Sequence, residues 1–427
     1  MKKLSSVLIK NEEKLPRILG IFAALLASCF TFFRGIQKIN ITDGFSYLYQ
    51  AESLLKGQDY IFSNPSDFSH GIIFSAILAF TFIVLGSTNL LLFKLILSML
   101  FGLTVYLLVR IAQEIGLSAF SYTVLAFLCI ADPFLLFPAT DIQTESVTTF
   151  IVVYWAYLYI VPARLNAIRK LDSVFFGITG GFAILMRPNF LLPVLGIGVL
   201  FYFKWRRENV ANNGIKFAIA IIFAILSVYE IFLFRLYSGF VFLANYGGFG
   251  AAYLCKADFI PQYLGFASRE QNLQINEWVN VENPLTKIAV SSLTNPSLAE
   301  INSKLYRIGI ESCLANPIES SWLIMLRLFS VWRPSVVFGA YSFEIFILSV
   351  LFWVPLTYFM IKFIRGRDYG SPMRRLRIYF LVMGGSFTVS LLLTFPQVRH
   401  RVAFAEVFYW LFAVIVIQQL YSKRKMK

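Results

Sequence analysis

Charged side chains are scarce in this chain. Only 14% of its 427 residues are Asp, Glu, Lys or Arg, whereas soluble globular domains carry about 25%. Apolar residues reach 58% and aromatic residues 17% of the sequence, and the mean hydropathy is +0.69. This composition excludes an ordinary soluble domain. It is typical of helices that face lipid, with aromatic residues at the membrane interface.

Cysteine is also rare. Four Cys residues are too few for a disulfide scaffold or a Cys-rich metal site. Cys29 and Cys129 lie inside apolar runs, which predicts that they are small packing residues. Cys255 and Cys313 share one long polar loop and can pair only if that loop faces an oxidising compartment. The sequence alone favours two thiols.

Several catalytic signatures are missing. The sequence has no Gly-rich phosphate loop, no Ser/His/Asp order and no H-E-x-x-H motif. Its net charge of +15 comes mostly from short Lys and Arg clusters between apolar runs, which is a topology signal and not a phosphate-binding face. We therefore expect the partner to be the lipid bilayer and not nucleic acid. No small-residue cleavage site follows the first apolar run, so this run is predicted to remain as a helix.

Apolar runs are the most abundant feature. A helix needs about 20 apolar residues to cross the hydrocarbon core, and several of the runs are shorter. The candidates are Ile18–Phe33, Ile72–Gly86, Leu90–Val109, Ser118–Phe137, Val147–Val161, Val174–Leu185, Phe190–Phe203, Ile215–Leu236, Tyr341–Ile364, Ile378–Phe395 and Val402–Tyr421.

Basic clusters decide which runs cross. Under the positive-inside rule each cluster should be cytoplasmic, and this holds only if one run before Arg164 does not span. The weakest is Ile72–Gly86, which we expect to be re-entrant or interfacial. The sequence thus predicts an all-α polytopic membrane protein of about ten transmembrane helices with both termini cytoplasmic. The clusters are Lys2/Lys3/Lys10/Lys14, Arg164/Arg169/Lys170, Lys204/Arg206/Arg207, Arg365/Arg367/Arg374/Arg375/Arg377 and Lys423/Arg424/Lys425/Lys427.

The outer segments follow from this topology. We expect one transmembrane domain over residues 1–427, a first extracytoplasmic segment over residues 37–89 with juxtamembrane helices, and a large extracytoplasmic loop over residues 237–340. Within the large loop, Leu298–Leu314 has helical apolar spacing. Ser320–Val337 has an amphipathic pattern and is predicted to lie at the interface.

Acidic residues gather in these outer segments. Asp43 follows the first predicted span and could take a proton from a hydroxyl acceptor at the membrane surface. The alternative is that Asp43 is the N-cap of a helix beginning near Phe45, and for this residue taken alone we favour the cap. Asp141 and Glu145 lie in the short second outer loop, where acids are usually solvated. Asp132 lies in an apolar run and needs a partner or an aqueous cavity.

Arginines at the outer ends run against the positive-inside bias. Arg187 breaks the chain between two spans, and Arg399, His400 and Arg401 lie between the last two. The arginines could contact lipid headgroups or acidic neighbours. For Arg399 and Arg401 we favour recognition of a lipid phosphate, because guanidinium matches phosphate in a bidentate way. The only other histidine is His70, and two isolated histidines make a poor metal signature.

Together these pieces resemble the GT-C superfamily of membrane glycosyltransferases, and within it the protein mannosyltransferase and aminoarabinose transferase branch. The resemblance covers most of the chain in short motifs. They are Asp43 with Tyr47, Ala51, Leu55 and Gly57; Asp132-Pro133 through Thr144-Glu145-Ser146; Leu185-Met-Arg-Pro188; Asn316-Pro317 through Leu328 with Trp332-Arg-Pro334; and Arg399-His-Arg401. Departures are a single acid at Asp43-Gly44 and Glu406 where proline is common.

The resemblance implies a GT-C-like fold and an inverting transfer from a polyprenyl-phosphate sugar to a protein, lipid or glycan hydroxyl. Asp43 would be the general base, Glu145 a second acid of the active site, and Tyr47, Arg187, Arg399, His400 and Arg401 would contact substrate. No cofactor is implied with certainty, and a divalent metal is an open alternative. The Lys-rich tail favours a bacterial inner membrane, with the active site on the extracytoplasmic face.

Transport is the main alternative. A transporter or flippase of lipid-linked or anionic substrates would need charged or broken helices near the bilayer midplane. In this sequence the ionisable residues crowd the outer ends, and only Glu230, Arg235 and Glu406 fall within spans. A polytopic subunit without catalytic activity is the third alternative, but it leaves the outer acids and arginines unexplained.

Overall fold

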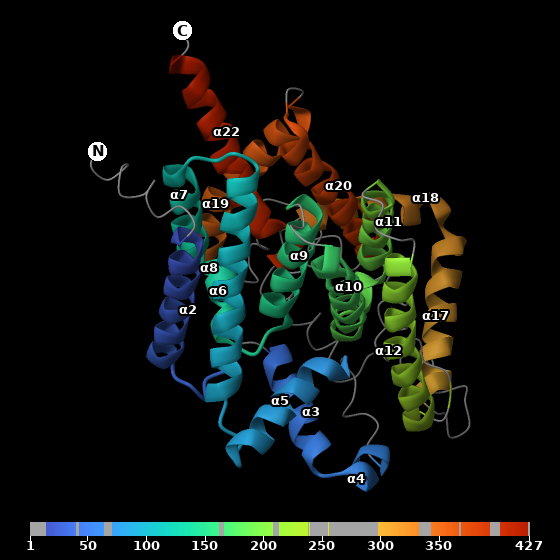
Figure 1. The fold of residues 1–427 in the computed structure, drawn as a ribbon. Coiled ribbons are helices and arrows are strands. Elements are labelled where there is room, and N and C mark those ends of the chain that lie inside the picture. The colour runs from blue at the N-terminus through green and yellow to red at the C-terminus, as the bar shows by residue number, and fades with distance from the viewer. Residues whose placement is uncertain are drawn as a thin grey trace.

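The computed structural model describes residues 14–39, 42–63, 71–161, 166–207, 213–237, 239, 255, 298–332, 343–366, 369–392 and 402–425. Every regular element in these ranges is a helix (Figure 1). The elements are α2 (Leu15–Arg34), α3 (Thr42–Leu55), α4 (Gln58–Ser63), α5 (Ile72–Leu85), α6 (Leu91–Glu114), α7 (Ala119–Ala131), α8 (Pro133–Leu136), η2 (Pro138–Thr140), α9 (Thr144–Ile160), α10 (Asn166–Met186), η3 (Pro188–Phe190), α11 (Leu191–Arg207), α12 (Asn213–Tyr237), α17 (Leu298–Ala315), α18 (Pro317–Trp332), α19 (Phe343–Arg365), α20 (Ser371–Leu392), the π-helix η5 (Val402–Glu406) and α22 (Val407–Lys425).

Six segments among the described residues are long and apolar enough to cross a membrane: α2, α6, η3 with α11, α12, α19, and η5 with α22. A seventh arises if α7 and the α8–η2 segment, bent by 66° at Asp132, form one broken span. The chain is therefore a multi-pass helical membrane protein, as its composition predicts. The prediction of about ten spans also requires α9, α10 and α20, and it stays a prediction.

Close backbone contact holds neighbouring helices together. Gly20 on α2 faces Gly102 on α6, where a Cβ on Gly102 would lie only 2.5 Å from the Gly20 carbonyl oxygen. Gly177 on α10 faces α12 in the same way, with a Cβ 3.0 Å from the Ala218 carbonyl oxygen, and Gly181 makes room for the Ile225 side chain of α12. Because lipid supplies little hydrophobic force between helices, small residues that allow this approach stabilise the packing.

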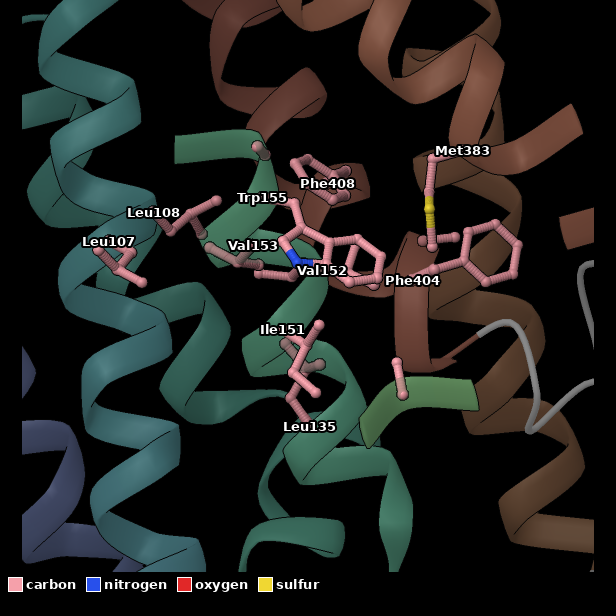
Figure 2. Packing of buried hydrophobic residues seen from close by; sticks show 14 of the residues in the cluster. Leu107, Leu108, Leu135, Ile151, Val152, Val153, Trp155, Met383, Phe404 and Phe408 are labelled. Carbon is pink, nitrogen blue, oxygen red and sulfur yellow. The ribbon is translucent and has the colours of Figure 1, made fainter. Parts of the chain in front are cut away.

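Helix α9 lies at the centre of the bundle. Its Ile151, Val152, Val153 and Trp155 are buried between α6 and the C-terminal helices (Figure 2). The Trp155 indole donates to Thr179 Oγ1 of α10 at 2.9 Å. Tyr379 of α20 donates to the Val152 carbonyl oxygen at 2.6 Å. These buried hydrogen bonds fix α9 relative to both neighbours, and they therefore fix the residues at its first turn.

Helices α3, α4 and α5 lie together at one end of the bundle (Figure 1). Helix α5 packs against α3, where Ser75 donates to Gln50 Oε1 at 2.9 Å. It is a short apolar helix and falls below the length of a span. This arrangement agrees with the expectation that Ile72–Gly86 does not cross the membrane.

The large loop contains two described helices, α17 and α18. Helix α17 matches the helix predicted over Leu298–Leu314. Helix α18 matches the first part of the amphipathic segment predicted over Ser320–Val337, whose last residues lie outside the described ones. Helix α18 exposes four large apolar side chains, those of Ile318, Trp322, Met325 and Phe329, although Glu319 and Ser321 are exposed as well. Its buried residues are half polar (Ser320, Arg327, Ser330) and half apolar (Leu323, Leu326, Val331). An apolar outer face of this kind is expected beside lipid.

A disulfide joins Cys255 to Cys313 at the end of α17, which corrects the preference for two thiols. Its formation requires an oxidising compartment, so it agrees with an extracytoplasmic position for the large loop. The sequence could not decide this point because the two residues are 58 positions apart. In the described residues Cys29 and Cys129 are free.

Alkylation of the denatured protein tests this disulfide. We expect two thiols to react before reduction, those of Cys29 and Cys129, and all four Cys to react after reduction. Closing a loop of this length stabilises a fold by about 4 kcal/mol in the chain-entropy estimate. The double variant Cys255→Ser/Cys313→Ser should therefore melt at a lower temperature, and Cys29→Ser serves as its control. Four reactive thiols without reductant would contradict the assignment.

Candidate functional site

The end of the bundle beside α3 collects charged residues from distant parts of the chain. Arg34, the last residue of α2, donates through Nη1 to Thr140 Oγ1 at 2.9 Å. Its Nη2 lies 3.6 Å from Asp141 Oδ2, and the two side chains are only 14% and 1% exposed. The guanidinium also lies over the Phe137 ring, 4.6 Å from its centroid. The expectation that Asp141 is solvated is wrong, because Asp141 is buried against a cation.

A second cation lies beside this pair. Lys94, in the first turn of α6, is 1% exposed. Its Nζ donates to the Lys38 carbonyl oxygen at 2.7 Å, and it lies within electrostatic range of Asp141 and Arg34. Sequence reasoning missed both cations. The same argument that singled out Arg187, a cation at an outer helix end, could have found them.

The start of α3 packs against this region. A Cβ on Gly44 would lie 3.2 Å from the Ile142 carbonyl oxygen and 2.6 Å from Ile39 Cγ2, so only glycine allows this approach. Asp43, the residue before it, is therefore held near the loop between Asp141 and Glu145. It is the second residue of α3 and not its N-cap, so the capping interpretation is wrong. The Asp43 side chain lies outside the described part of the structure.

Tyr47 lies one turn further along α3. It is 5% exposed, and its ring packs edge-to-face on Phe74 of α5, with centroids 4.8 Å apart. The described contact is thus a packing contact that holds α3 on α5. Whether Tyr47 also contacts substrate stays a prediction.

Glu145 and Arg187 form an ion pair. Arg187 has extended backbone between α10 and η3, which directs its side chain to the first turn of α9. Its Nη2 lies 2.5 Å from Glu145 Oε1, with side chains 11% and 6% exposed, and its Nε donates to Thr144 Oγ1 at 2.7 Å. The expectation of a solvated Glu145 is therefore wrong. The structure brings together two residues that the sequence singled out separately.

The residue before α5 approaches the backbone that leads to Arg187. A Cβ on Gly71, which precedes α5, would lie 1.9 Å from the Leu185 carbonyl oxygen and 3.0 Å from that of Met186. Gly71 therefore touches the backbone immediately before Arg187, and any larger residue would separate the two. His70 lies outside the described residues.

Arg399, His400 and Arg401 also lie outside the described residues, but the flanks of their loop are placed. Phe387 of α20 packs on Phe404 of η5, with centroids 4.4 Å apart, and on Phe190 of η3 at 5.1 Å. Trp332, the last residue of α18, donates to Thr388 Oγ1 at 3.0 Å. The elements on both sides of the loop therefore meet beside the interruption between α10 and α11, which consists of Arg187 and η3 and is called the Arg187 break below.

Two further acids are buried within the bundle. Asp132 accepts from the Trp410 indole and from the Phe134 amide, both at 2.7 Å, so it has the partners that its position in an apolar run requires. It also caps α8 and marks the 66° bend. Glu406 of η5 is fully buried and accepts from the Trp353 indole. No local pattern in the sequence indicates this contact, since the two residues lie 53 positions apart on different helices.

Within the described ranges, no group of three or more His, Cys, Asp or Glu side chains could hold a metal ion. A divalent metal at this end would need ligands from the remaining residues. The site as described consists of two buried ion pairs, Arg34 with Asp141 and Arg187 with Glu145, and of Lys94 beside the first pair.

The chain matches no protein-family model, and no curated protein sequence is significantly similar to it. The class defined by the fold is a multi-pass helical membrane protein with a charged site at one end of its bundle. The likeness to membrane glycosyltransferases rests on the residues themselves.

Proposed function

We propose that the protein is a membrane glycosyltransferase that moves a sugar from a polyprenyl-phosphate donor to an acceptor hydroxyl at the extracytoplasmic face. One observation carries this proposal. Three of the five segments that resemble glycosyltransferase motifs meet at one end of the bundle: the start of α3, the loop before α9, and the Arg187 break. Their contacts are Gly44 with Ile142 and Arg187 with Glu145.

The opposite end of the bundle supports the proposed side of the membrane. There the Ser118 amide donates to Gln418 Oε1 at 3.1 Å, and Lys204 donates to the Leu158 carbonyl oxygen. The basic clusters of α11 and α22 lie at this end, which the positive-inside rule makes cytoplasmic. In a ten-span topology the charged site then faces the extracytoplasmic side, where polyprenyl-linked donors present their sugars.

The proposed reaction is one inverting displacement. Asp43 takes the proton from the acceptor hydroxyl, whose oxygen forms the new bond to the anomeric carbon. The bond from that carbon to the phosphate oxygen breaks, and the phosphate leaves with the electron pair. Arg399 and Arg401 are assigned to this charge, because guanidinium groups pair with phosphate oxygens. No acid is needed for the leaving group, unlike in glycosidases.

Glu145 takes a positioning role in this proposal. Its carboxylate is occupied by Arg187, and a buried ion pair keeps both side chains in one arrangement. The contacts of Arg187 with Glu145 and Thr144 hold the first turn of α9 against the Arg187 break. We therefore assign proton transfer to Asp43 and geometry to the Glu145–Arg187 pair.

Sugar transfer by the purified protein tests the proposal. In lipid nanodiscs it is offered a panel of polyprenyl-phosphate hexoses and pentoses with peptide, glycolipid and oligosaccharide acceptors, and release of polyprenyl phosphate is measured. We expect turnover with at least one donor and inversion at the anomeric carbon. Binding of a donor without turnover, together with its movement between leaflets of a liposome, would support a flippase and contradict the enzyme.

A further inference from the structure

Two buried polar atoms in the Arg187 break have no partner. They are Nη1 of Arg187 and Oδ1 of Asn189, two residues further along. The other guanidinium nitrogens are satisfied by Thr144 and Glu145. Buried side-chain polar atoms are normally hydrogen-bonded, and leaving one unpaired costs free energy. A donor and an acceptor left unpaired in one short break call for a group that supplies both.

The break holds Asn189 in place. Pro188, the residue before Asn189, is the first residue of η3, and its ring fixes its own backbone angle φ. Phe190 follows, fully buried, with its amide donating to the Arg187 carbonyl oxygen at 2.9 Å and its ring on Phe387. Because both neighbours are anchored, the backbone of Asn189 is held in place, and its partly buried side chain starts from a fixed position.

The chemistry of the two atoms selects among ligands. A phosphate only accepts hydrogen bonds and would leave Asn189 Oδ1 unpaired. An ammonium group only donates and would leave Arg187 Nη1 unpaired. A hydroxyl both donates and accepts, as water does, so neighbouring hydroxyls could replace water at both atoms. Within the proposed function, the group that carries several hydroxyls to this end of the bundle is a sugar.

We propose that Asn189 and the free nitrogen of Arg187 bind hydroxyls of the transferred sugar, which makes Asn189 a specificity-determining residue of the site. This rests on the proposed function, and it assigns a substrate contact to a residue that no motif indicated. Sites built to hydrogen-bond a hydroxyl discriminate strongly against analogues that lack it, because the site's own polar groups are then left unpaired.

Two variants of the full-length protein test this, Asn189→Leu and Asn189→Asp. The leucine side chain has a similar size and no polar atom, whereas aspartate keeps the acceptor oxygen. With the donor that the wild type uses, Asn189→Leu is expected to lower kcat/KM by about 10-fold or more, and Asn189→Asp should retain more of it. With a donor lacking the contacted hydroxyl, wild type and Asn189→Leu should turn over equally.

Thermal unfolding without substrate supplies a second readout. Since Asn189→Leu removes an unpaired buried atom, its melting temperature should equal or exceed that of the wild type. The donor-induced rise in melting temperature should shrink in the same variant. A variant that keeps the melting temperature of the free protein but loses the donor-induced rise has lost a substrate contact. Replacement of a residue with only a structural role would lower the melting temperature of the free protein as well.

Three results would overturn the inference. Unchanged kcat/KM and unchanged donor-induced stabilisation in Asn189→Leu would mean that the break holds an ordered water only. An equal loss with every deoxy donor would mean that Asn189 shapes η3 and does not read a hydroxyl. A melting temperature of donor-free Asn189→Leu below that of the wild type would also mean that Asn189 shapes η3. Absence of transfer by the wild type would contradict the proposed function instead, and donor-induced stabilisation would still test Asn189.

Discussion

Replacing Asp43 with asparagine is expected to lower kcat by about 10²- to 10⁴-fold, the range that a general base contributes. The amide keeps the size of the carboxyl group but cannot accept the acceptor's proton. Donor binding should survive, because the phosphate contacts that we assign lie elsewhere. Asp43 is the second residue of α3, so the helix and the Gly44 contact with Ile142 should remain. The measurement is the rate of polyprenyl phosphate release at saturating donor.

Asp59 provides the matched control. It lies in the first turn of α4 and is exposed, within the same outer segment. Asp59→Asn should leave kcat unchanged. If Asp43→Asn retained full turnover, the base would have to be sought at Glu145, and Asp43 would be a residue of the first helical turn that favours the helix dipole.

Breaking the Arg187–Glu145 pair is expected to cause the largest loss of stability. Arg187→Ala leaves the Glu145 carboxylate buried without its cation, and loss of one partner of a buried pair costs about 3–5 kcal/mol. It also frees Thr144 Oγ1 from its contact with Nε. We expect a clear fall in the melting temperature of the detergent-solubilised protein. The double variant Arg187→Met/Glu145→Leu should recover much of it, because no charge is then left unpaired.

Arg307 and Glu311 on α17 form a pair of similar geometry for comparison, with Nε 2.7 Å from Oε1. Their side chains are 79% and 60% exposed, and exposed pairs contribute little to stability. Arg307→Ala should therefore leave the melting temperature unchanged. A melting temperature for Arg187→Ala equal to that of the wild type would show that Glu145 is solvated, and the site would then be more open than the structure describes.

The sequence alone determined the class of the protein. Composition and the positions of the basic clusters indicate a polytopic helical membrane protein, because crossing a membrane depends on runs of about 20 apolar residues that are local in the chain. The helix over Leu298–Leu314 was predicted from its apolar spacing for the same reason. Ile72–Gly86 was set apart by a charge count, and the structure packs it on α3 at one end of the bundle.

Only the tertiary structure decided the site. Arg187 and Glu145 are 42 residues apart, Arg34 and Thr140 are 106 apart, and Cys255 and Cys313 are 58 apart. Each had to be judged in the sequence as a single residue, so the acids were expected to be solvated and the cysteines to be thiols. Burial and pairing arise from the surfaces that meet when helices pack, and no local pattern encodes them. The unpaired atoms of Arg187 and Asn189 became visible for the same reason, since an unmet hydrogen bond exists only relative to the groups that surround it.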